Sequence, residues 1–191
     1  MSADERTMIE RVLAGDDRAF LALVERHQSK AMTLELRVLG NREDAEEALQ
    51  DAFLRAYRSL DKFRLQSSFA TWLYRIIFNV CSTRLRRRSS DIRTGSLESI
   101  EESVDIDRPD LQLESMELHE IVQRGIEEMP TVYAGVFSLF FVQELSYEEI
   151  AEVTDLPLNT VKTRLFRARR MLRAYVLKQT GEGVSGGSMI L

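Results

Sequence analysis

The sequence predicts an all-α protein with two small helical domains joined by a flexible acidic linker, the second domain being a helix-turn-helix. Apolar residues recur at helical spacing along most of the chain, and no segment alternates for long as a β-strand would. A serine-rich, acidic stretch separates the two helical parts. Near the C-terminus, a capped helix, a short turn with a proline and a cationic helix follow one another.

These features divide the 191 residues into four parts. We expect an N-terminal helical domain at residues 1–88, the linker at residues 89–112 and the C-terminal domain at residues 113–180. Residues 181–191 are rich in glycine, and we expect a disordered tail there. Each domain is near the lower end of the usual size range.

Composition limits the class of protein. Hydrophobic residues make up 44% of the chain and charged residues 30%, as in a soluble globular protein. No apolar run is long enough to cross a bilayer, and the N-terminus lacks the pattern of a signal peptide, so we expect an intracellular protein without membrane insertion. The single cysteine, Cys81, forms no internal disulfide and lies far in sequence from His27 and His119. We therefore expect no metal site and no cofactor.

The distribution of charge matters more than the net charge of −5. The segment 91–120 holds ten acidic residues against Arg93 and Arg108 and so carries −8, which leaves +3 for the rest of the chain. Two basic clusters flank this acidic segment. The pattern indicates two nucleic-acid contacts joined by a linker that avoids or mimics nucleic acid.

The helix-turn-helix is the most informative motif. Ser146 and Glu149 form a capping box that predicts the start of its first helix, and Pro157 suits the first turn of the second helix. Four apolar residues make one buried stripe along that second helix: Val161, Leu165, Ala168 and Leu172. From Thr160 to Lys178 every charged residue is positive. A solvated basic face in an ordinary helical bundle is the alternative.

In a helix-turn-helix, the second helix enters the major groove of DNA with its N-terminal part. The residues that we expect on its DNA side are Asn159, Thr160, Lys162, Thr163, Phe166, Arg167 and Arg170. Arginine and lysine donate to guanine, and an exposed phenylalanine packs on a thymine methyl. We expect Arg164, Arg169, Arg170 and Arg173 to contact phosphates and to set affinity more than sequence choice.

Two further helices are predicted in the N-terminal domain. Asn41 begins the first, whose charged side presents Gln50, Asp51, Leu54, Arg55 and Arg58; such faces are usually only solvated. The second runs from Phe69 to Arg88, and one side carries Trp72, Arg75, Asn79, Thr83 and Arg86. These residue types can stack on unpaired bases and hold the backbone. The alternative is that Trp72 and Tyr74 are core aromatics.

Three blocks in this order resemble a known family. Residues 44–64 (DAEEALQDAFLRAYRSLDKFR), 71–79 (TWLYRIIFN), and 145–151 with 160–169 (LSYEEIA and TVKTRLFRAR) are similar to extracytoplasmic-function (group IV) sigma factors of bacterial RNA polymerase, in the sigma-70 family. The similarity covers essentially residues 5 to 178. It implies that the N-terminal domain is sigma region 2 and the C-terminal domain sigma region 4.

The resemblance also implies partners and site residues. The face with Gln50, Asp51, Leu54, Arg55 and Arg58 docks on the β′ clamp helices of core RNA polymerase, and the β flap is a further contact. The minus-ten promoter element is melted and read by Phe63, Trp72, Arg75, Asn79, Thr83, Arg84 and Arg86. The helix-turn-helix reads the minus-thirty-five element. A cytoplasmic protein is expected, under an anti-sigma factor that sequesters it, in some cases at the inner membrane, until a stress or other signal arrives.

Two other functions were weighed against this one. A helix-turn-helix regulator that binds an operator as a dimer, without polymerase, explains the C-terminal domain but leaves the aromatic and basic N-terminal segment without a role. An enzyme is not favoured, because the sequence offers no glycine-rich phosphate loop, no histidine or cysteine cluster with metal-ligand spacing and no Ser-His-Asp set. Catalysis is expected to belong to the polymerase.

Overall fold

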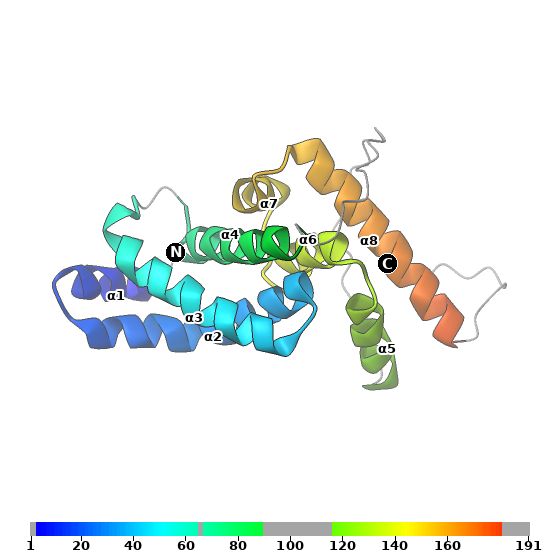
Figure 1. Cartoon of the computed structure of the whole chain (residues 1–191), viewed down its shortest axis with the longest axis horizontal. Coiled ribbons are helices and arrows are strands. Elements are labelled where there is room, and N and C mark those ends of the chain that lie inside the picture. The colour runs from blue at the N-terminus through cyan, green and yellow to red at the C-terminus, as the bar shows by residue number, and fades with distance from the viewer. Residues whose placement is uncertain (1–2, 65–66, 90–115, 181–191) are drawn as a thin grey trace.

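The computed structural model describes residues 3–64, 67–89 and 116–180, and every regular element among them is a helix, as predicted (Figure 1). The first part contains α1 (Ala3–Leu13), α2 (Asp17–Leu39), α3 (Arg42–Ser59), a short 3-10 helix η1 (Leu60–Lys62) and α4 (Phe69–Ser89). The second contains α5 (Met116–Glu127), α6 (Thr131–Phe141), α7 (Tyr147–Thr154) and α8 (Leu158–Thr180). Apart from Ser89, the predicted linker lies outside the described residues, as does the tail at 181–191.

Local signals in the sequence fix several helix ends. The Asp16 side chain accepts a hydrogen bond from the backbone N–H of Arg18 at the start of α2, and Gly40 ends this helix in the left-handed conformation, with φ 75°. The Asn41 side chain accepts from the N–H of Asp44 at 2.8 Å and so caps α3, as predicted. None of the described helices combines the length and apolar character needed to cross a bilayer.

Small residues let the first helices pack closely. The buried face of α3 includes Ala45, Ala48, Ala52 and Ala56, and it lies against α2 and α4 (Figure 1). From α4, Phe69, Leu73 and Ile77 are fully buried in the same interior. These buried residues belong to the core of the first part, whereas Tyr57 of α3 is 41% exposed.

The second part is a helix-turn-helix preceded by two helices. Val161, Leu165, Ala168 and Leu172 of α8 are buried, as predicted. The capping box of α7 is present: the Ser146 hydroxyl accepts from the N–H of Glu149, whose carboxylate accepts from the N–H of Ser146. Pro157 is predicted in the first turn of α8, but the helix begins one residue later, at Leu158. Pro157 directly precedes the helix, and its carbonyl accepts from the N–H of Val161.

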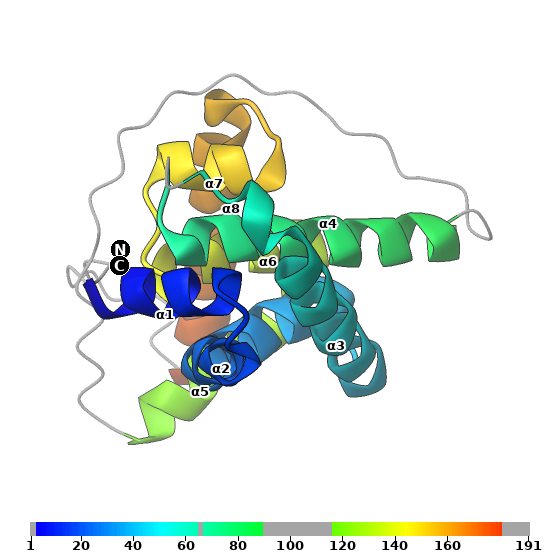
Figure 2. The same ribbon diagram turned by 90° about the vertical axis from the view of Figure 1, so that its left-hand side faces the viewer.

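The two parts do not stand apart. One hydrophobic core cluster runs from Leu23 and Ile77 in the first part to Leu139, Ile150 and Leu165 in the second. Helix α6 packs on α2, and α7 packs on α4, as two perpendicular views show (Figures 1 and 2). A smaller cluster joins α5, α6 and α8 within the second part. Nothing in the sequence predicts that the two parts pack on one another.

Candidate nucleic-acid and protein interfaces

The predicted DNA-reading residues lie along the first half of α8. Asn159 and Arg170 are exposed, whereas the other five are half-buried: Thr160, Lys162, Thr163, Phe166 and Arg167. Thr163 donates its hydroxyl proton to the carbonyl of Asn159, at 2.9 Å. In this conformation the Thr163 hydroxyl can accept a hydrogen bond from a ligand, but its proton is already used. The helix thus presents a mixed surface of amide, hydroxyl and cationic groups.

Neighbouring groups hold two of these side chains in place. The Arg167 guanidinium donates to the Tyr133 hydroxyl of α6, at 3.4 Å. The Arg170 guanidinium lies over the Phe166 ring, 5.8 Å from its centroid. An open apolar hollow of about 390 Å³ adjoins them, lined by Tyr133, Arg167, Arg170, Met171 and Ala174. Two of the side chains predicted to read DNA, Arg167 and Arg170, are therefore held by contacts within the protein.

Arg169 does not point to a phosphate as the sequence predicts. Its guanidinium lies over the rings of Phe140 and Phe141, at 5.6 and 5.2 Å from their centroids, and its Nε is buried. Burial lowers the pKa of Arg169 and of the half-buried Arg164. Arg169 packs α8 on α6, and Arg170 and Arg173 remain exposed on the outside of the helix.

The aromatic residues predicted for the minus-ten site form a cluster at the start of α4. The Phe63 ring lies 5.2 Å from Trp72 and 6.0 Å from Phe69, measured between centroids. Phe63 is buried, whereas Trp72 is half-buried. Tyr74 is 1% exposed, so for this residue the alternative of a core aromatic is confirmed. Trp72 is therefore more accessible from solvent than Phe63.

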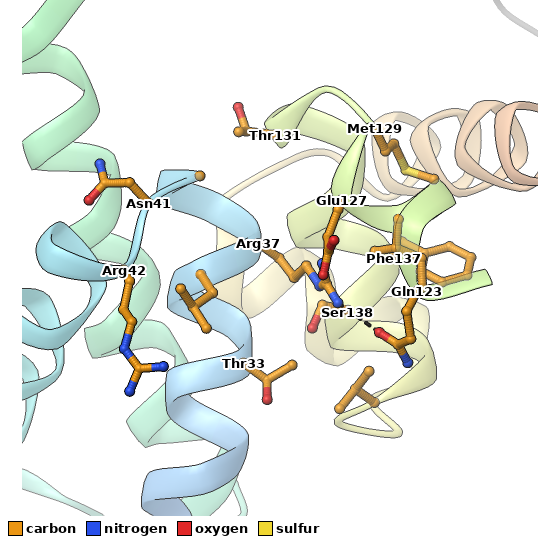
Figure 3. Close-up of a pocket in the computed structure, with 14 residues that line it drawn as sticks. Thr33, Arg37, Asn41, Arg42, Gln123, Glu127, Met129, Thr131, Phe137 and Ser138 are labelled. Atoms are coloured by element: carbon orange, nitrogen blue, oxygen red, sulfur yellow. Dashed lines mark hydrogen bonds and ion pairs between the residues drawn. The ribbon is translucent and has the colours of Figure 1, made fainter. Parts of the chain in front are cut away.

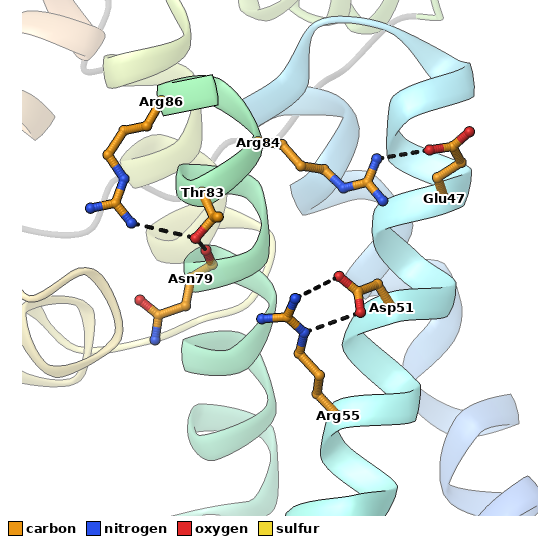
Figure 4. Close-up of polar contacts among 7 residues, drawn as sticks. All are labelled: Glu47, Asp51, Arg55, Asn79, Thr83, Arg84 and Arg86. Atoms are coloured by element: carbon orange, nitrogen blue, oxygen red, sulfur yellow. Dashed lines mark hydrogen bonds and ion pairs between the residues drawn. The ribbon is translucent and has the colours of Figure 1, made fainter. Parts of the chain in front are cut away.

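In Figure 4, Asn79 and Arg86 of the same helix point away from α3, whereas Arg84 points towards it. Arg75, Asn79 and Arg86 are exposed. Thr83 donates to the carbonyl of Asn79 at 2.8 Å and accepts from Arg86 at 3.4 Å. Arg84 instead bonds Glu47 of α3 at 2.9 Å. In this conformation Arg84 ties α4 to α3.

The charged face of α3 is open, as predicted. Gln50, Leu54, Arg55 and Arg58 are exposed, and Leu54 is 53% exposed. The Arg55 guanidinium makes two hydrogen bonds to the Asp51 carboxylate, at 3.1 and 2.9 Å (Figure 4). Protein interfaces typically have an apolar centre with polar groups around it. The exposed Leu54 beside the ion pair of Asp51 and Arg55 has this arrangement.

Sequence reasoning missed a buried carboxyl group. Glu35 of α2 is 0% exposed, and neither of its oxygens has a hydrogen-bond partner among the described residues. Burial raises the pKa of Glu35 to about 8, although the nearby Arg84 acts in the opposite direction. Burial and the Glu35 carboxyl raise the pKa of the Cys81 thiol to about 12. No sequence signal distinguishes Glu35 from the exposed acids of the same helix.

A cavity of about 680 Å³ lies where the two parts meet (Figure 3). Arg37 of α2 reaches across it to Gln123 and Glu127 of α5, at 2.8 and 3.5 Å. The buried Ser138 hydroxyl also lines it and has no hydrogen-bond partner among the described residues. These residues do not form a metal site, and the described part of the chain holds no cluster of three or more histidine, cysteine or acidic side chains that could.

Comparison with known proteins supports the resemblance. The model of sigma-70 region 2 matches residues 23–90, and that of sigma-70 region 4 matches residues 119–172. The ECF RNA polymerase sigma-E factor of Haemophilus influenzae is 38% identical over 176 residues, which cover 88% of this chain and 93% of that protein. The protein of the same name from Escherichia coli K12 is 39% identical over 176 residues, or 88% and 92% of the two chains.

Solved structures share the fold. CnrH, in complex with the cytosolic domain of CnrY, aligns with a TM-score of 0.62 and 24% identity over 95% of this chain and 99% of that one. The sigma factor RpoE of Bartonella quintana, in complex with the anti-sigma factor NepR, also has a TM-score of 0.62, with 22% identity over 83% of this chain and 96% of that one.

Proposed function

Because this chain belongs to the extracytoplasmic-function sigma factors of RNA polymerase, in the sigma-70 family, we propose a division of its surfaces among polymerase, promoter and inhibitor. The chain is a transcription initiation factor and not an enzyme. The observation that supports the proposal best is the cationic helix α8, which follows the capped helix α7 in a helix-turn-helix. The first part of the chain has a separate charged face on α3.

The α3 face binds core polymerase at the β′ clamp helices. Leu54 would fill an apolar hollow, and the ordered pair of Asp51 and Arg55 would offer one acceptor and one donor to charged groups of the clamp. Gln50 and Arg58 border this centre. The second part makes a further contact with the β flap.

The α4 surface melts and reads the minus-ten element. Arg75, Asn79 and Arg86 are exposed and would contact the non-template strand directly, with Thr83 beside them. Trp72 would stack on an extruded base, and Phe63 would support Trp72 from behind. Extruding a base costs a few kcal/mol, which stacking and a fitted pocket offset. Arg84 would join the site after leaving Glu47.

The α8 surface reads the minus-thirty-five element. Lys162 and Arg167 would donate to guanine in the major groove, while Thr163 and Asn159 make polar contacts at the same edge. Thr160 lies at the edge of this proposed α8 surface. The stacked pair of Phe166 and Arg170 would place an apolar ring on a thymine methyl and a cation on a phosphate.

The protein works in the cytoplasm under the control of an anti-sigma factor and initiates a stress or signal-responsive regulon. The relatives CnrH and RpoE were each solved with a bound partner, which for RpoE is the anti-sigma factor NepR. The exposed faces of α3, α4 and α8 are the surfaces that such a partner would cover.

The test is run-off transcription from randomised promoters with bacterial core polymerase, in the presence and absence of this protein. We expect initiation to depend on the protein and the selected promoters to share two elements. A variant with Arg167 replaced by alanine is the control, because it should shift the preference at the upstream element only. DNA binding without initiation, also with a polymerase of the matching organism, would contradict the proposal.

A further inference from the structure

A buried polar pair joins α1 to α2. The Oε1 atom of Glu5 lies 3.0 Å from Nε2 of His27, and the two side chains are only 13% and 9% exposed. The neighbouring ion pair of Asp4 and Arg26 has a similar length, 3.1 Å, but its side chains are 62% and 44% exposed. Exposed ion pairs contribute little to stability, because water and salt screen them. The pair of Glu5 and His27 differs from this neighbour in being shielded from water.

The bond between Glu5 and His27 fixes the orientation of the His27 ring. A carboxylate only accepts hydrogen bonds, so Nε2 of His27 carries the proton of this bond. Burial lowers the pKa of His27 from its ordinary value of 6.5; the bond and the charge of Glu5 oppose this shift, and Arg26 and Lys30 add to it. Apolar residues of similar volume often stabilise a protein as well as a buried polar pair does. The contribution specific to this pair is therefore the orientation of the ring.

The His27 ring contacts the aromatic cluster that we propose for minus-ten recognition. Its centroid lies 5.3 Å from that of Phe69, with 58° between the ring planes. Phe69 is 0% exposed, and its centroid lies 5.7 Å from Trp72 and 6.0 Å from Phe63. All three separations are typical of aromatic side chains in contact. A chain of contacts therefore runs from Glu5 through His27 and Phe69 to Trp72.

Helix α1 lies against the elements that carry this cluster. It packs on α2, and it contacts η1, which ends one residue before Phe63 (Figures 1 and 2). Burial raises the pKa of Tyr74 in α4 to about 12, and the charge of Glu5 adds to this shift, so Glu5 also lies close to α4. Glu5 is therefore placed where α1, α2 and α4 come together.

We propose that Glu5 and His27 are positioning residues for minus-ten recognition. Their bond orients the His27 ring, the ring holds Phe69, and Phe69 sets the position in which Trp72 stacks on an extruded base. Stacking depends on the offset and the angle between two rings, so a small displacement of Trp72 weakens it. This inference rests on the proposed function, and it adds to the minus-ten site a support that comes from α1.

The test measures promoter opening by the full-length protein with core polymerase, on a promoter selected in the run-off experiment. Permanganate oxidises unpaired thymines and so reports opening of the minus-ten element. Glu5→Ala removes the acceptor for His27, whereas Glu5→Gln keeps an oxygen that accepts from Nε2. His27→Gln keeps a donor for Glu5 but removes the ring from Phe69. The matched control is Glu10→Ala, which removes an exposed acid of α1 that pairs with the exposed Arg6.

Trp72 provides an independent readout, because it is the only tryptophan of the chain. We expect Glu5→Ala and His27→Gln to make its emission easier to quench with acrylamide and to lower promoter opening several-fold. Capture of core polymerase and binding to a minus-thirty-five duplex should stay unchanged. Glu5→Gln should restore most of the opening, and Glu10→Ala should match the unsubstituted protein in every readout.

Unchanged opening in a folded Glu5→Ala or His27→Gln variant would overturn the inference. A Glu5→Gln variant as defective as Glu5→Ala would also overturn it. A loss of core capture or of minus-thirty-five binding in step with opening would do the same, since that pattern shows only a structural role. If the unsubstituted protein opens no promoter, the proposed function fails; if it opens one and Glu5→Ala opens it equally well, only the positioning role is refuted.

Discussion

Replacing the buried Glu35 by glutamine should change how the stability of the protein depends on pH. Glu35 lies in the interior without a hydrogen-bond partner among the described residues, beside Cys81 and Arg84 of α4. Burial raises the pKa of Glu35 from its ordinary value of 4.5 to about 8, while Arg84 opposes the shift. Between these values the folded protein keeps a proton that the unfolded chain has already released.

The sign and size of the effect follow from this difference. Above pH 4.5 the unfolded chain gains from ionising Glu35 and the folded protein does not, so the free energy of unfolding falls as the pH rises. The fall is about 1.4 kcal/mol for each pH unit and stops near pH 8, where the folded protein also ionises. At neutral pH the accumulated loss is about 3 kcal/mol, a large part of the stability of a typical domain.

The assay is urea unfolding followed by circular dichroism at several pH values between 4.5 and 8. Glutamine keeps the shape of the neutral acid, so Glu35→Gln should match the original protein at the acid end and exceed its stability by about 3 kcal/mol near neutral pH. Glu25→Gln, at an exposed position of the same helix, is the control and should leave the pH dependence unchanged. Parallel curves for the original protein and Glu35→Gln would refute the reasoning.

Three other outcomes are expected. Arg167→Ala should lose about 1 to 3 kcal/mol of binding at one promoter position, whereas Arg173→Ala should weaken all sequences alike; equal effects in a binding assay on promoter variants would contradict the assignment. Exchanging Asp51 and Arg55 keeps an ion pair on α3 but should abolish capture of core polymerase while binding to a minus-thirty-five duplex persists; unchanged capture would place that interface elsewhere. Burial raises the pKa of Glu149, but hydrogen bonds from Ser146 and Thr71 outweigh it and leave the pKa below 4.5. The ionised carboxylate therefore stabilises the folded protein above pH 4.5, and this stability is lost as the pH falls further. In urea unfolding, Glu149→Gln should lower the free energy of unfolding above pH 4.5 and have no such effect at lower pH.

The elements of the fold could be predicted because their signals are local. The caps at Asn41 and Ser146 and the stripe from Val161 to Leu172 each lie within one helix, and the structure contains all of them. The candidate faces on α3 and α8 followed from the same reasoning, since a stripe that is buried leaves the opposite side of its helix exposed. Periodicity thus predicts which side of a helix is covered.

Periodicity does not predict what covers it. Leu139 and Ile150 are apolar whether they pack within one domain or between two, and Gly135 matters because Val38 of another helix lies against it. Arg169 belongs to a run of cations that looks like a phosphate-binding surface, yet Phe140 and Phe141 draw it inward. Glu35 has no hydrogen-bond partner among the described residues that would mark it. Each of these features depends on contacts between residues that are distant in the chain.

Glu149 makes two contacts, of which the sequence predicts only the capping box of α7 and not the bond to Thr71 of α4. The capping box accounts for its position fully, so sequence reasoning looks for no second role. In the structure, however, its two oxygens have separate tasks: Oε2 serves the cap of α7, and Oε1 binds Thr71 of α4. The Glu149 bond to Thr71 can therefore be lost without loss of the cap that Glu149 gives to α7. The bond to Thr71 contributes about 1.5 to 3 kcal/mol as a hydrogen bond to a charged group, so it helps to hold α7 against α4.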